Sequence, residues 1–155
     1  MDWLDEVRIR LKKRSQVLWA LDLAAESVAK LEEKYPDETR PKEALKAARA
    51  WAAGKIKMRP AQRKILDCHA FAKEIDSKED IALCHAVGQA CAVVHTAGHT
   101  IGYPMYDLSA VVYRLGIENC AEVIEQRRQE YIRKLFYWNE HICDYKGEWA
   151  DFMLK

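Results

Sequence analysis

The amino-acid sequence predicts an all-α protein, a single-domain bundle of about seven helices packed as antiparallel αα-hairpins. Val, Ile and Thr are sparse, and no segment alternates strictly between apolar and polar residues over the length of a strand. Four prolines fall between segments of helical periodicity, where helices begin and end: Pro36, Pro41, Pro60 and Pro104. The connections are short, about 2–6 residues, and favour antiparallel packing of consecutive helices. A length of 155 residues suits one domain.

The first three helices are predicted from their periodicity and from the residues at their ends. Residues 2–13 are charged and amphipathic, and Ser15 is expected to cap a second helix over about 16–34, where apolar residues recur every three or four positions. A third helix follows over about 41–53. It opens on a proline, which suits the first helical position, and Gly54 favours its termination.

The fourth and fifth helices flank a capping signal. An apolar stripe at spacings of four and three predicts a helix over about 60–75. The segment 77–80, with Ser77 first and Asp80 in place of the usual glutamate, resembles a capping box. We therefore expect a fifth helix to run from 78 to about 101.

The last part of the chain is predicted to contain two further helices and a tail. The segment 102–104 (GYP) interrupts the chain and begins a sixth helix, which Gly116 ends. A long seventh helix is expected over about 118–143, followed by a short aromatic tail.

Composition and charge exclude several classes of protein. Lys and Arg number 25 and Asp and Glu 24, so a globally basic nucleic-acid binder is not expected. The start, MDWLDE, lacks the basic region of a secretory signal, and the most apolar stretch, 81–101, contains three histidines, so no membrane span is expected. The five cysteines form no C-x-x-C pair, which indicates reduced thiols and a cytoplasmic location.

The predicted fifth helix carries imidazoles and glycines along one face. At ~100° per residue, one arc of roughly 100° contains His85, Gly88, Ala92, His95, His99 and Gly102. Small residues leave a hollow beside the rings, and imidazoles there can bind a ligand or move protons. The candidate ligand-binding residues are His85, Gly88, His95, His99, Gly102 and Tyr103.

Two of these histidines could hold a metal ion. His95 and His99 stand four residues apart, a spacing that supplies half of a metal site on a helix. The segment lacks the glutamate of an H-E-x-x-H motif, and a third ligand would have to come from another helix. A metal ion, a ligand pocket and simply hydrogen-bonded histidines, buried or at an interface, all remain open, and no cofactor is otherwise expected.

Two Cys-His dipeptides lie on either side of the turn near residue 77. If the fourth and fifth helices form a hairpin, His69 and His85 are equally far from the turn and could face each other, with Cys68 and Cys84 nearby. Zinc would accept two cysteines and two histidines as ligands. However, adjacent residues on a helix diverge by ~100°, so the two members of each dipeptide cannot easily point at one ion. Cysteine in an apolar stripe usually acts as a small hydrophobe.

Catalysis has little support in the sequence. No G-x-S-x-G elbow or phosphate-binding loop is present, and Cys91, four residues before His95, is expected to be buried. We therefore do not expect an enzyme.

The seventh helix carries a candidate partner-binding face. The segment 127–138 mixes aromatic and basic residues, which are enriched at protein interfaces. An aromatic core face opposite a solvated basic face is the alternative interpretation, and neighbouring glutamates disfavour nucleic acid. The candidate partner-binding residues are Arg127, Arg128, Tyr131, Arg133, Tyr137 and Trp138.

Several segments together resemble a bacterial family of immunity proteins, the immunity-protein-five-like helical domain. These segments are RPKEA (40–44), ARAWAAG (48–54), DCHA (67–70), CHAVGQA (84–90), VVHTAGH (93–99) and GYP (102–104). The resemblance divides the domain, 1–155, into an N-terminal helix (1–14), a family-like core (15–145) and an aromatic tail (146–155). It implies an all-helical protein that binds and neutralises a toxin by protein–protein interaction, and it assigns no site residues.

Two functions therefore stand as hypotheses. The first is an immunity protein whose partner is a protein toxin, with a homodimer left open by the Ala-rich helices. The second is a small helical metal- or ligand-binding protein or enzyme that uses the His/Gly-lined pocket.

Overall fold

The computed structural model describes residues 13–154 and confirms the all-α prediction, because this range contains helices and no strand. The predicted helix over 2–13 lies outside the described residues except for Lys13, which belongs to α2. The α-helices are α2 (Lys13–Lys34), α3 (Arg40–Ala52), α4 (Met58–Ala72), α5 (Lys78–Ala92), α6 (Gly102–Leu115) and α7 (Ala121–His141). The short 3₁₀ helices are η1 (Ala97–Thr100), η2 (Ile142–Asp144) and η3 (Asp151–Met153).

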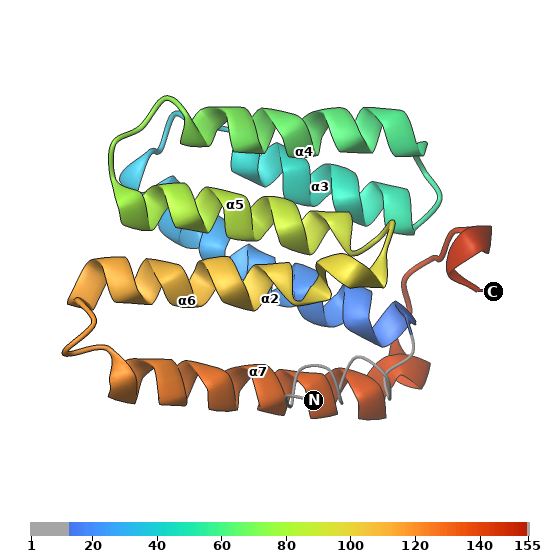
Figure 1. Ribbon diagram of the computed structural model, residues 1–155. Helices are drawn as coiled ribbons and strands as arrows, with labels where there is room; N and C mark the ends of the chain where they lie inside the picture. Colours follow the sequence, from blue (N-terminus) through green and yellow to red (C-terminus); the bar gives the residue numbers. More distant parts are fainter. Residues whose placement is uncertain (1–12, 155) are drawn as a thin grey trace.

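Helix α5 lies at the centre of the bundle. It packs against α2, α3, α4 and α6, while α7 packs mainly against α2 (Figure 1). Small residues allow four neighbours to approach one helix, and α5 buries Ala82, Leu83, Cys84, Ala86, Val87, Gly88, Ala90 and Cys91. Only a narrow stripe of α5, which includes His85 and Gln89, remains partly open between α4 and α6.

The capping signal at residue 77 is confirmed. The Ser77 side chain accepts a hydrogen bond from the Asp80 amide at 3.2 Å and so begins α5. The Asp80 carboxylate accepts hydrogen bonds from Lys34 Nζ and the Tyr35 hydroxyl, each at 2.7 Å. Burial, together with this carboxylate, raises the pKa of Tyr35 to about 12. The capping turn therefore also ties the end of α2 to the start of α5.

The two helix ends predicted from glycines are correct, and the cap predicted at Ser15 is not. Gly54 and Gly116 follow α3 and α6 with φ of 78° and 83°, a conformation that favours glycine. Ser15 lies inside α2 rather than before it, because the helix begins at Lys13. Its hydroxyl is buried and has no hydrogen-bond partner within the described residues.

The predicted single helix over 78–101 is wrong. Helix α5 ends at Ala92, the chain turns through 93–96, and η1 leads into α6. Thr96 adopts an extended backbone, and its hydroxyl accepts a hydrogen bond from the Gly98 amide at 3.3 Å. Two β-branched valines, a threonine that bonds locally and a glycine together disfavour helix at this point. His95 and His99 therefore do not lie on a common helical face.

None of the helices within residues 13–154 combines the length and the apolarity that crossing a membrane requires.

Candidate functional site

An open cavity of about 730 Å³ lies at the end of the bundle where α3 meets α4, and we call it the aromatic hollow. It is formed by the α3–α4 turn, the segment after α5 and the C-terminal tail. Its lining residues are Trp51, Ala53, Gly54, Ile56, Lys57, Met58, His95, Trp149, Ala150, Asp151 and Phe152. Apolar and aromatic walls with a few charged groups are typical of binding sites.

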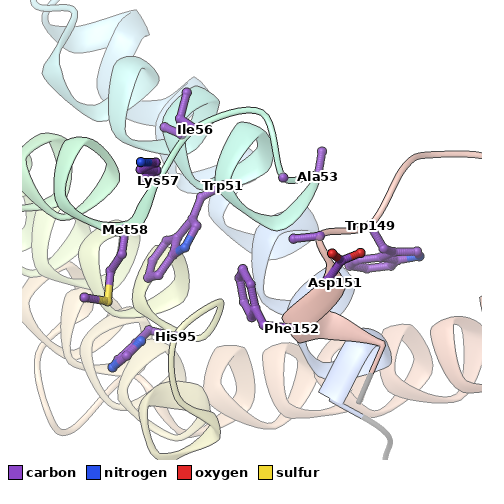
Figure 2. A pocket seen from close by; sticks show the side chains of 11 residues that line it. Trp51, Ala53, Ile56, Lys57, Met58, His95, Trp149, Asp151 and Phe152 are labelled. Carbon is purple, nitrogen blue, oxygen red and sulfur yellow. The ribbon is translucent and has the colours of Figure 1, made fainter.

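Trp51 is the central side chain of the aromatic hollow. It comes from the last turn of α3, is 3% exposed, and stacks on the His95 ring at 5.9 Å between centroids. The Phe152 ring, from η3, lies on another side of the indole, with 6.3 Å between the two ring centroids. Figure 2 shows the indole pointing into the hollow between Met58 and Phe152. Because Trp51 is fixed by burial, the aromatic wall is formed before any partner arrives.

The C-terminal tail forms one wall of this hollow. The Ala150 amide donates a hydrogen bond to the Ala52 carbonyl oxygen at 2.7 Å, which joins the tail to the end of α3. The tail approaches the end of α3 closely, since a Cβ on Gly54 would lie 3.2 Å from the Ala150 Cα. The aromatic tail predicted from sequence is thus part of the candidate site, a role that its sequence did not indicate.

A second open cavity of about 380 Å³ adjoins the first, and we call it the histidine hollow. It is lined by Trp51, Gln62, Ile65, Leu66, His69, Gly88, Gln89, Ala92, His95 and His99. Trp51 and His95 line both hollows, so the stacked pair forms the wall between them.

Two imidazoles face each other across the α4–α5 hairpin, as the sequence predicts. His69 Nδ1 and His85 Nδ1 lie 2.7 Å apart, so one ring donates and the other accepts, which requires opposite tautomers. The His85 ring also packs against Tyr106, 5.3 Å away. Gly88 makes room for the pair, because a Cβ there would lie 2.3 Å from His69 Nε2.

Burial favours the neutral form of both rings. It lowers the pKa of His69, and positive charge on His85 or His99 would lower that pKa further. Burial likewise lowers the pKa of His85, with a smaller contribution from Lys73. Protonating both rings would place two positive charges at hydrogen-bond distance.

We expect the free energy of unfolding to fall as the pH is lowered from 7 to 5.5. The folded-state pKa of His69 and of His85 lies below the ordinary value of about 6.5, so the unfolded chain binds more protons in this window. The slope is at most about 1.4 kcal/mol per pH unit for each histidine. Urea unfolding at a series of pH values measures it. In His69→Gln and in Gly88→Ala, whose new Cβ displaces the His69 ring, the slope should become shallower. An unchanged slope in both variants would contradict the assignment.

The cysteines beside these histidines point into the core. Cys68 and Cys84 are fully buried, and Cys68 Sγ lies 3.5 Å from the Cys84 carbonyl oxygen. Burial raises the pKa of Cys84 and of Cys91 to about 12, so neither thiol is activated as a nucleophile. Among the described residues, no group of three or more His, Cys, Asp or Glu side chains has the arrangement of a metal site.

The six predicted ligand-binding residues are only partly brought together. Gly88, His95 and His99 line the histidine hollow, whereas His85 reaches it only through His69. His69 also lines the histidine hollow. It is absent from the six predicted ligand-binding residues, although the predicted α4–α5 hairpin places it opposite His85.

The other two predicted ligand-binding residues lie elsewhere. Gly102 packs against Gln89, whose side-chain oxygen accepts a hydrogen bond from His99 Nδ1 at 2.9 Å. Tyr103 does not face the hollow, because it is buried between α2 and α7, where its hydroxyl donates to the Leu23 carbonyl oxygen at 3.0 Å.

The predicted partner-binding face on α7 is likewise divided. Arg127 and Tyr131 point inward, where Arg127 Nε donates to Asp107 at 2.7 Å and the Tyr131 hydroxyl also donates to Asp107. Both residues are therefore structural contacts rather than surface ones, contrary to the prediction. Arg127 also bonds Glu26 and Glu130, so this cluster joins α2, α6 and α7.

The remaining residues of that face lie toward solvent. Arg133 and Tyr137 are exposed, and Arg128 forms an ion pair with Glu125 at 2.7 Å. Trp138 is partly buried, with its indole N–H donating to Asp22 at 3.0 Å. This outer surface of α7 stays a second candidate for partner binding.

Comparison with known proteins identifies a family. The model of a family described as "Imm-5 like putative immunity protein" matches residues 9–134. The searches of curated proteins and of solved structures found no match. The match covers helices α2 to α6 and the greater part of α7. It ends before the C-terminal tail that completes the aromatic hollow. Because it spans well over half of the 155 residues, this chain belongs to the Imm-5 like putative immunity protein family.

Proposed function

We propose that this protein is a bacterial immunity protein that binds and neutralises a toxin in the cytoplasm by direct protein–protein contact. Membership of the immunity-protein family is the observation that carries the proposal. The contact surface that we assign to the toxin is the aromatic hollow.

The chemistry of the aromatic hollow supports this assignment. Aromatic residues in a preformed, concave surface contribute most to the binding energy of protein interfaces, because they exclude water over a large area at low entropic cost. Trp51 is already buried and fixed, while Met58 and Phe152 at the rim are 40% and 38% exposed. A side chain of the toxin could enter between them without rearranging the bundle.

A growth assay tests the proposal. Candidate toxin domains encoded in the same genome are produced one at a time in a bacterial host, with and without this chain. We expect the chain to restore growth against one of them and to form a complex of defined stoichiometry with it on size exclusion with light scattering. Failure to restore growth against any of them would contradict the proposal.

Two matched variants locate the surface. Met58→Asp places a charge at the rim of the aromatic hollow, and Tyr137→Asp does the same on the outer surface of α7; both positions are exposed, so folding should be preserved. We expect Met58→Asp to abolish protection and Tyr137→Asp to retain it. The reverse result would assign the toxin to α7.

Ligand binding in the histidine hollow is a second candidate, and one observation favours it. Three imidazoles and two side-chain amides line a single cavity of about 380 Å³. Native mass spectrometry of the purified protein would reveal a bound small molecule. We would then expect its mass to be absent from His69→Ala and His99→Ala.

A further inference from the structure

The aromatic hollow is bordered by a strongly basic segment. Residues 54–64, GKIKMRPAQRK, contain five basic residues and no acidic one, although the whole chain has a formal net charge of only +1. The segment forms the α3–α4 turn and the first half of α4.

Four of these five basic side chains form no ion pair with another described residue. Lys55, Lys57, Arg59 and Arg63 are exposed, and none of them forms an ion pair within residues 13–154. Only Lys64 is paired, with Glu43 at 3.7 Å. The turn therefore presents uncompensated positive charge to solvent.

The positive charge lies directly beside the apolar walls. Lys57 lies between two apolar lining residues in the sequence, Ile56 and Met58, and lines the same hollow as Trp51 (Figure 2). The opposite wall, formed by the tail, carries the Asp151 carboxylate. The hollow is thus positive on the side of the α3–α4 turn and negative on the side of the tail.

We infer that the toxin presents an acidic segment with an aromatic or large apolar side chain, which enters the aromatic hollow while its carboxylates lie over the α3–α4 turn. This inference rests on the proposed function and names the chemistry of the partner. Charge complementarity of this kind speeds association and selects partners more than it adds affinity. A protein segment is favoured over nucleic acid because the apolar and aromatic walls suit a large apolar side chain flanked by carboxylates, whereas a phosphate backbone has no such side chain to place there.

A labelled peptide tests the inference directly. The probe is a nine-residue fluorescein-labelled peptide of Glu and Asp with one central Trp, followed by fluorescence anisotropy. Peptides with Lys in place of the acids and with Ala in place of Trp serve as controls, together with single-stranded oligothymidylate. We expect only the acidic Trp peptide to bind measurably, and its affinity to fall several-fold between 50 and 300 mM NaCl. Equal or tighter binding of the oligonucleotide, or no binding of the acidic peptide, would overturn the inference.

Two triple variants with the same change in net charge test whether peptide binding depends on the charge of the α3–α4 turn or on the net charge of the whole protein. Lys55→Glu/Lys57→Glu/Arg59→Glu reverses the charge at the hollow, while Lys30→Glu/Lys46→Glu/Lys78→Glu reverses exposed lysines elsewhere. We expect the first to weaken binding of the acidic peptide at least tenfold and the second to change it less than twofold. Equal losses in both would overturn the inference.

The growth assay distinguishes this inference from the proposed function. If the wild-type chain protects against a toxin and Lys55→Glu/Lys57→Glu/Arg59→Glu does not, the inferred partner chemistry is supported. Protection by both would overturn the partner chemistry while the immunity function stands. Protection by neither would overturn the immunity function, and the peptide measurement would still decide the charge preference of the hollow.

Discussion

Asp107→Ala should reduce the free energy of unfolding by about 3–5 kcal/mol. A single domain is typically stable by only about 5–15 kcal/mol, so this loss would remove a large part of the total. The reason is the position of Asp107, which is 2% exposed on α6 and accepts hydrogen bonds from Arg127 and Tyr131 on α7. Removal of the Asp107 carboxylate would leave the Arg127 guanidinium incompletely paired and the Tyr131 hydroxyl without its acceptor in the interior.

The cluster around Asp107 holds three helices together. The Arg127 side chain is only 11% exposed, and it also donates to the Tyr103 hydroxyl at 3.0 Å. Burial and the Asp107 carboxylate hold the pKa of Tyr131 well above its ordinary value, so that its hydroxyl remains a donor. Helix α7 makes comparatively few contacts with α6, so this polar cluster has a large part in fixing α7 to the bundle.

Urea unfolding of Asp107→Ala and of Glu130→Ala measures the effect. Glu130 bonds the same guanidinium at 2.7 Å but lies nearer to solvent, where an ion pair contributes about 1 kcal/mol or less. The double variant Asp107→Leu/Arg127→Met should recover part of the loss, because it removes both buried charges together. Equal stability of the two single variants would show that the buried carboxylate does not stabilise the fold.

Features set by local chemistry were predictable from the sequence. Ser77 caps α5 through an interaction that spans three residues, and Gly54 ends α3 with a positive φ. That His69 and His85 lie opposite each other was also predictable, because both residues are equally far from the turn of one helical hairpin. In each case the deciding contacts are close in sequence or fixed by simple helix geometry.

Features set by tertiary contacts were not predictable in the same way. Periodicity alone extended the fifth helix to residue 101, whereas the chain turns after Ala92 and η1 packs against α2, α5 and α6. The Thr100 hydroxyl donates to the Gln16 side-chain oxygen at 3.0 Å, a contact with α2 that periodicity does not reveal. Arg127 and Tyr131 have the composition of an interface, and only the position of Asp107 on another helix shows that they are internal. The aromatic hollow combines segments from 51 to 152, and no local pattern brings such distant residues together.

Trp51→Ala should also cost about 3–5 kcal/mol in the free energy of unfolding, and it should open the aromatic hollow. The indole is nearly fully buried and forms the wall between the two hollows. Removing it leaves a cavity and takes away the ring against which His95 stacks and Phe152 packs. Since η3 belongs to the tail, we expect the tail to separate from α3 before the bundle unfolds.

Hydrogen exchange distinguishes loss of the tail from loss of the bundle. The Ala150 amide, which donates to Ala52, should lose its protection in Trp51→Ala under conditions where the amides of α5 remain protected. Trp51→Phe, which keeps an aromatic ring in place, should retain most of that protection. Phe152→Ala should release the tail at a cost of about 1 kcal/mol or less, because Phe152 is partly exposed. If the Ala150 amide exchanged at the same rate in Trp51→Ala as in the wild-type chain, Trp51 would not be the support of the tail, and the wall that the tail provides for a partner would depend on other contacts.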